Sequence, residues 1–165
     1  MVFSLSAQGG DRSTYDQLWD LEKKATLQEE KIRLLMSLGR FSEPELLQET
    51  LERSLSSDVR SQDTISVVGS VASNLRGRDL AWDFVKSNWA ELDRRYGGGG
   101  FGLMRLVSIG SSFTNQEKLD DFESFFQEHS VPAAERTIRQ ALERMRLNIK
   151  WLERNRTELA SWFGG

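Results

Sequence analysis

Apolar residues recur every three or four positions along most of the chain, and alternation of apolar and polar residues is almost absent. This spacing places apolar side chains on one face of an α-helix and does not suit a half-buried strand. The segment 62–73, rich in Val and Ile, would also suit a strand, but no partner strand is visible. The pattern therefore predicts helices over about 11–25, 27–39, 44–54, 62–73, 78–96, 101–109, 114–129, 132–154 and from 155 onward.

Four sites pair a Ser, Thr or Asn with a Glu three residues later, which is the pattern of a helix capping box. At the second site Pro44 suits the first helical turn, where its missing N–H has no helical partner. At the fourth, Asn155 also opens a glycosylation sequon, which we interpret as a helix start. The four pairs are Thr26 and Glu29, Ser42 and Glu45, Thr114 and Glu117, and Asn155 and Glu158.

Nine or ten such helices with short linkers predict an all-α protein. Helices joined by short linkers pack as antiparallel pairs, and a row of pairs forms a right-handed stack of the HEAT or armadillo kind. No exact internal repeat is legible in the sequence. With 165 residues, the chain is predicted to form a single helical unit over residues 1–165.

Four consecutive glycines occupy positions 97–100. A phosphate-binding loop needs a preceding strand and a following Gly-Lys-Ser/Thr, whereas here a helix precedes and Phe101-Gly102-Leu103 follows. We interpret the glycines as a connector, in which Gly97 takes the left-handed conformation that ends a helix.

The composition restricts the possible functions. A net charge of -3 predicts no nucleic-acid partner, and the lack of any apolar run near the ~20 residues of a membrane span predicts a cytoplasmic protein without a membrane partner. The chain has no cysteine and one histidine, His129, which follows FFQE at a predicted helix end and suits the helix dipole there. We therefore expect no cofactor, no metal site and no catalytic residue in this chain.

A basic stripe is the most suggestive surface feature. Wound at about 100° per residue, five cations fall within about a quarter-turn of the helix predicted from 132. They form either an exposed face laced by salt bridges or a set of cations that binds the carboxylate end of a peptide. The basic stripe consists of Arg136, Arg139, Arg146, Lys150 and Arg154. The opposite face, expected to be buried, carries Ile138, Ala141, Leu142, Met145, Ile149 and Leu152.

The chain resembles the carboxy-terminal end of the puromycin-sensitive aminopeptidase branch of the gluzincin zinc aminopeptidases. Four segments carry the resemblance: ATLQEEKIRLLMSLG, VRSQDTISVVGSVASNLRGRDLAWDFVKSNWAELDRRY, FTNQEKLDDFESFF and AERTIRQALERMRLNIKWLERNRTELASWF. The resemblance covers residues 2–163 and implies a large enzyme with an N-terminal β domain, a thermolysin-like zinc domain and a C-terminal domain of stacked helix pairs. In that family the helical domain encloses the peptide chamber.

Under this resemblance the chain is the last part of that helical domain. It lacks the His-Glu-x-x-His motif, the third glutamate ligand and the Gly-Ala-Met-Glu-Asn segment, so no catalytic residue is assigned. Zinc then belongs to the parent enzyme, and the expected partners are its catalytic and upstream helical domains and a peptide substrate. The alternative is a free-standing helical-repeat module that binds another protein.

The matching region starts directly after Met1, so we expect an expressed fragment or a truncated gene product. A repeat stack needs a neighbour or a polar cap on each side. The apolar residues Phe3 and Leu5 at the amino end are therefore expected to associate with a second copy or to be poorly ordered.

Overall fold

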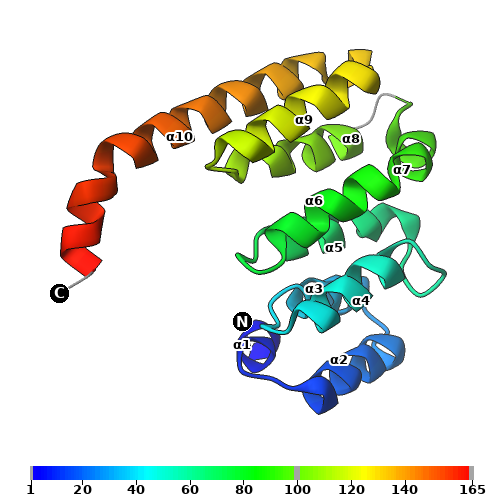
Figure 1. Ribbon diagram of the computed structural model, residues 1–165. Helices are drawn as coiled ribbons and strands as arrows, with labels where there is room; N and C mark the ends of the chain where they lie inside the picture. Colours follow the sequence, from blue (N-terminus) through cyan, green and yellow to red (C-terminus); the bar gives the residue numbers. More distant parts are fainter. Residues whose placement is uncertain (1, 99–100, 164–165) are drawn as a thin grey trace. The chain divides into compact units, whose positions relative to one another are not determined.

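The computed structural model describes residues 2–98 and 101–163, which contain ten α-helices, two short 3₁₀ helices and no strand (Figure 1). The predicted all-α class is therefore confirmed. The chain divides into two compact units, with the boundary between Arg95 and Tyr96, beside the glycine run. Gly99 and Gly100 lie outside the described residues, and the connector role of the run stays a prediction.

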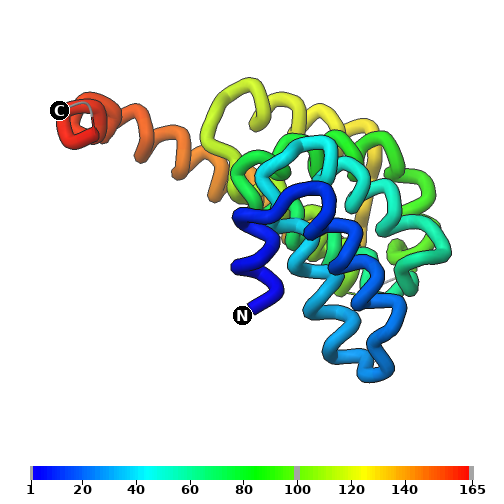
Figure 2. Tube along the Cα trace, turned by 90° about the horizontal axis from the view of Figure 1, so that it is seen from below, coloured from blue at the N-terminus to red at the C-terminus, as the bar shows by residue number. Residues whose placement is uncertain are grey.

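The first unit is built from consecutive short helices that pack in pairs. Helix α2 packs on α3, α4 on α5 and α5 on α6, and the next-but-one contacts of α3 with α5 and of α4 with α6 add each layer to the one before. Figure 2 shows the same succession along the Cα trace. The helices are α1 (Val2–Gln8), α2 (Arg12–Lys24), α3 (Gln28–Leu38), α4 (Pro44–Ser54), α5 (Ser61–Ala72), α6 (Arg78–Ser87) and α7 (Trp89–Tyr96).

The core of this unit is apolar and closely packed. Trp82 and Phe41 are completely buried, and the aliphatic side chains that α3, α4 and α5 direct inward are buried as well. Helix α1 contributes little to this core, because Ala7 is its buried residue, Phe3 is half-buried and Leu5 is exposed. Whether Phe3 and Leu5 associate with a second copy stays a prediction.

The second unit packs one long helix on several short elements. Helix α10 contacts α8, α9 and both 3₁₀ helices. It is 29 residues long, and its buried residues all lie in its first half. The elements are α8 (Phe101–Val107), η1 (Ser108–Ser112), α9 (Gln116–Glu128), η2 (Pro132–Ala134) and α10 (Glu135–Phe163).

The predicted capping boxes are wrong at three of the helix starts. The N-cap of α3 is Leu27 and that of α4 is Glu43, and neither makes a side-chain cap hydrogen bond. Thr26 and Ser42 each stand one residue too early, so their hydroxyl groups do not cap the first turn. At α9 the cap is Asn115 rather than Thr114, because the Asn115 Oδ1 atom accepts from the Lys118 N–H at 2.8 Å.

The predicted helix bounds are also wrong at two asparagines, one where a boundary was not expected and one where it was. The helix expected over 78–96 is divided at Asn88, whose side-chain Nδ2 atom donates to the Phe84 carbonyl oxygen at 2.9 Å, where its own backbone N–H also donates. The boundary expected at Asn155 is absent, since α10 runs through it and Asn155 Nδ2 donates to the Trp151 carbonyl oxygen at 2.6 Å. Asn155 therefore caps no helix.

An asparagine side chain holds one turn in each unit. In the first unit, Asn74 Nδ2 donates to the carbonyl oxygens of Gly39 (3.1 Å) and Phe41 (2.7 Å) in the turn after α3. In the second, Asn148 Nδ2 donates to the Phe113 carbonyl oxygen (3.3 Å) and to the carbonyl oxygen two residues earlier (3.0 Å). Both phenylalanines are buried. This asparagine clamp is a repeat that the sequence alone did not reveal.

Candidate functional site

The basic stripe lies entirely on α10, and all five of its side chains are exposed. Arg146 donates to both carboxylate oxygens of Glu123 on α9, at 3.1 and 3.3 Å. Within the described part of the chain, the other four cations form no ion pair. The stripe is therefore not laced by salt bridges along its own helix, and most of its charge faces solvent.

The opposite face of α10 is buried along only part of its length. Ala141, Leu142, Met145 and Ile149 are buried, as predicted. Ile138 is half-buried and Leu152 is exposed, so the prediction that Leu152 is buried is wrong. The reason is that α10 extends beyond the short elements on which it packs, as Figure 1 shows for the end of α10 relative to α9.

Two stripe residues, Lys150 and Arg154, border a hollow of about 470 Å³ on the surface of α10. Arg136 and Arg139, nearer the start of the helix, do not line it. Trp151 lines the same hollow, so an aromatic side chain lies beside the cations, which suits a carboxylate next to an apolar group. The lining residues are Arg144, Leu147, Asn148, Lys150, Trp151 and Arg154.

Sequence reasoning missed the apolar part of this hollow. Leu147 and Trp151 are four residues apart, which places them on the same side of a helix. Wound at about 100° per residue, this side faces away from Met145 and Ile149, the residues that anchor α10 to its unit. The spacing of Leu147 and Trp151 therefore indicates this apolar side from the sequence alone.

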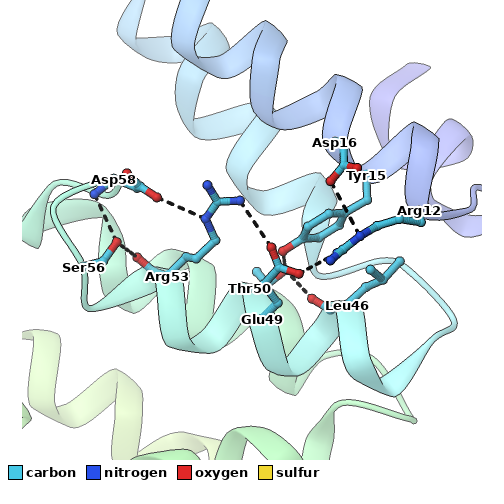
Figure 3. A network of polar contacts seen from close by, with 9 residues as sticks. All are labelled: Arg12, Tyr15, Asp16, Leu46, Glu49, Thr50, Arg53, Ser56 and Asp58. Atoms are coloured by element: carbon cyan, nitrogen blue, oxygen red, sulfur yellow. Dashed lines mark hydrogen bonds and ion pairs between the residues drawn. The ribbon is translucent and has the colours of Figure 1, made fainter.

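A polar network joins α2 to α4 in the first unit (Figure 3). The Glu49 carboxylate binds Arg12 at 2.5 Å and Arg53 at 3.4 Å, and the Arg53 Nε atom also donates to Asp58 at 3.1 Å. The Arg53 guanidinium group lies 4.1 Å from the ring centroid of Trp19. Each cation is matched by a carboxylate, so the network fastens two helices.

The buried end of this network is a hydroxyl pair. The Thr50 hydroxyl donates to the Leu46 carbonyl oxygen at 2.8 Å, so Tyr15 acts as donor in its 3.0 Å hydrogen bond to Thr50. Burial raises the pKa of Tyr15 above its ordinary value, which keeps the hydroxyl neutral and able to donate. The arrangement stabilises the helix pair and supplies no base or nucleophile.

An ion cluster sits on α7. The Glu91 carboxylate accepts hydrogen bonds from Arg94 (2.7 Å) and Arg95 (2.5 Å), which lower the pKa of Glu91 to about 2. Arg95 also donates to the Leu55 carbonyl oxygen at 3.2 Å and so ties α7 to the end of α4. The cluster therefore depends on an ionised Glu91.

Replacing this carboxylate should make stability respond differently to acid. Because the pKa of Glu91 is lowered from 4.5 to about 2, its ionised form favours the fold above pH 4.5 and loses that effect as the pH falls toward about 2. The difference in free energy of unfolding between the unchanged protein and Glu91→Gln should therefore shrink across this range. Urea unfolding at a series of pH values measures this difference. A difference that stays constant with pH would contradict the lowered pKa of Glu91.

His129 stands where the sequence placed it, at the C-terminal end of α9. Its Nδ1 atom lies 2.9 Å from the Phe125 carbonyl oxygen, and its ring stacks on that of Phe125 with centroids 4.3 Å apart. Among the described residues, no three or more His, Cys, Asp or Glu side chains gather as a metal site. Nor does any described helix combine the length and apolar character needed to cross a membrane.

Comparison with known proteins shows a matching domain family and several similar proteins. Residues 1–147 match the model of the ERAP1-like C-terminal domain family. The chain is 35% identical over 167 residues to aminopeptidase Ey of Gallus gallus, and the match covers 98% of this chain and 17% of that protein. It is also 35% identical over 162 residues to aminopeptidase N of Homo sapiens (95% and 17%) and 33% identical over 148 residues to aminopeptidase M1-C of Oryza sativa subsp. japonica (90% and 17%).

These matches cover nearly all of this chain but only a small part of each relative. The chain spans 17% of the length of aminopeptidase Ey, so it corresponds to one segment of such a protein. The aminopeptidase family expected from the sequence is confirmed. Because the family model matches most of its residues, the chain belongs to the ERAP1-like C-terminal domain family and forms part of the C-terminal domain of an aminopeptidase.

Proposed function

We propose that the chain is a helical segment of a zinc aminopeptidase that removes N-terminal residues from peptides, and that it encloses the substrate chamber and contacts the peptide through the basic stripe. Family membership supports the aminopeptidase part of this proposal. Zinc is then bound by parts of the enzyme outside this chain, since the chain has no cysteine and only one histidine. The cytoplasmic location and the absence of membrane or nucleic-acid partners stay predictions.

One observation carries the peptide-binding role. Four cations of one helix, Arg136, Arg139, Lys150 and Arg154, are exposed, and no carboxylate within the described residues pairs with them. A row of unpaired guanidinium and ammonium groups attracts the negative charge of a peptide carboxylate. The carboxylate end of a long peptide lies far from the N-terminal residue that is removed. Contacts with that end therefore contribute to the binding of long peptides and not of dipeptides.

Charge reversal tests this role in the full-length enzyme. We expect Arg136→Glu with Arg139→Glu to raise KM for long peptides by about fivefold to tenfold and to leave KM for dipeptides within about twofold. These two residues are chosen because Arg146 is held by Glu123 and its replacement would also disturb the packing of α9 on α10. Steady-state kinetics on a peptide length series provides the measurement.

The matched control reverses two other exposed cations of the same unit. Arg105 on α8 and Arg156 on α10 are exposed and have no ion-pair partner among the described residues, so Arg105→Glu with Arg156→Glu changes the net charge equally. Similar KM changes for long peptides in both double variants, or equal changes for dipeptides and long peptides in the stripe variant, would remove the proposed role.

A further inference from the structure

The C-terminal part of α10 is a helical arm that its own unit does not cover. No residue from Lys150 to Phe163 is buried. Figures 1 and 2 both show the end of α10 extending beyond α9, and the helix changes direction there. In proteins, most helical stability comes from tertiary packing of an apolar face rather than from helix propensity. Residues 150–163 continue a helix that is anchored by its first half, and a surface on which they pack would supply the tertiary contacts that this part lacks.

The arm carries apolar side chains on one side. The exposed fractions of Trp151 and Trp162 are 52% and 79%, and that of Leu147, which lies just before the arm, is 56%. A second hollow of about 310 Å³ follows the first along the helix and shares Trp151 with it. The second hollow is lined by Trp151, Asn155, Glu158, Leu159, Trp162 and Phe163. We call the side formed by Leu147, Trp151, Asn155, Glu158, Leu159 and Trp162 the arm seam.

The charges beside the arm seam indicate what it contacts. Arg144, Lys150 and Arg154 border it, and none of them has an ion-pair partner among the described residues. In the part of the chain that the structure describes, the first hollow has no acidic lining residue, and the second has one, Glu158. A second copy paired antiparallel about Asn155 would bring the two Arg154 side chains together, which is unfavourable. An apolar surface rimmed by carboxylates fits the seam better.

The relatives contain much more chain than the segment that matches. The match to aminopeptidase Ey includes 98% of this chain but 17% of that protein, so more than four-fifths of the relative lies outside the matched segment. A surface on the same polypeptide meets the arm at a high effective concentration. We propose that the arm seam docks on an acid-rimmed apolar surface in the upstream part of the same aminopeptidase polypeptide.

This inference rests on the proposed function, because it requires the longer enzyme. It also divides the basic stripe. Lys150 and Arg154 flank the docked surface, and the contact with the peptide falls to Arg136 and Arg139. Docking buries two tryptophans, a residue type that contributes strongly to interfaces.

Hydrogen exchange of the arm amides tests the docking. In the full-length enzyme the amides of residues 150–163 should exchange on the order of tenfold or more slowly than in the 165-residue chain. Trp151→Ala with Trp162→Ala in the full-length enzyme should restore the faster exchange, and Arg154→Glu should do so in part. Both tryptophans are more than half exposed, so these changes leave the core of the unit intact.

Two controls separate docking from general loosening. Leu75→Ala removes an exposed apolar side chain in the first unit, and Arg156→Glu reverses an arm cation on the side away from the seam. Neither should change the exchange of the arm. Equal exchange in the full-length enzyme and the 165-residue chain overturns the proposal, as does protection in the short chain that rises with its concentration, which indicates a second copy.

Activity distinguishes the two proposals. A full-length enzyme that cleaves peptides but leaves the arm unprotected contradicts the docking alone. A protected arm in a full-length protein without aminopeptidase activity contradicts the proposed function and supports the docking.

Discussion

Phe41→Ala is expected to lower the free energy of unfolding of the first unit by about 3–5 kcal/mol. The Phe41 side chain is completely buried and meets the Tyr15 ring edge-on, with centroids 5.3 Å apart. The turn is fixed by the Asn74 side chain, which binds the backbone of Gly39 and Phe41, and this contact remains when the ring is removed. The backbone therefore cannot collapse into the space, and a cavity persists.

Urea unfolding measures this loss, and Phe101→Ala is its matched control. Phe101 begins α8, and its side chain is 84% exposed, so its removal should change the free energy of unfolding by less than about 0.5 kcal/mol. A Phe41→Ala loss no larger than that of the control would show that the turn after α3 is not part of the core.

Gly39→Ala and Gly69→Ala should change stability in opposite directions. A Cβ atom on Gly39 would lie 2.7 Å from the backbone carbon of Ser70 and from the backbone nitrogen of Val71 in α5. Backbone atoms cannot move aside as a flexible side chain can, so Gly39→Ala should cost about 1–3 kcal/mol or more. The φ of Gly39 is -71°, so the cost comes from the close approach of α3 and α5 and not from backbone strain.

Gly69 provides the control within the same helix pair. It lies inside α5, and no heavy atom comes within 4 Å of the position of an added Cβ atom. Because glycine weakens a helix interior, Gly69→Ala should stabilise the unit by about 0.5–1 kcal/mol. Thermal unfolding of both variants checks the pair, and destabilisation of similar size in both would refute the packing argument.

The periodicity of apolar residues was sufficient to predict the helical class and the position of most helices, but it could not predict what each asparagine does. Asn115 caps a helix, Asn88 separates two helices, and Asn155 lies within one and binds the carbonyl oxygen of the preceding turn. All three use the same short amide, and the local alternatives differ by about 1 kcal/mol. The packing of the neighbouring helices decides which of these roles each asparagine takes, and a single sequence does not show that packing.

The candidate site was likewise predicted only in part from the sequence. Winding the sequence on a helix was enough to group the cations of the basic stripe on one side. It could not show that Arg146 binds Glu123, which lies on another helix, or that Trp151 borders a hollow with Lys150. Both facts depend on how far the short elements reach along α10, which is a property of the folded unit.

The asparagine clamp bears on how helical layers can be added to or removed from such a protein in evolution. Each clamp joins a buried phenylalanine to an asparagine further on, and the turns read Phe-Ser-x-x-Glu from Phe41 and Phe-Thr-x-x-Glu from Phe113. In both units, the stretch between the phenylalanine and its asparagine therefore begins with the same kind of turn. The first stretch ends at Asn74 in the turn after α5, so a layer of this kind can be duplicated or deleted with both cuts in turns, whereas the second ends at Asn148 inside α10 and cannot be removed without dividing that helix.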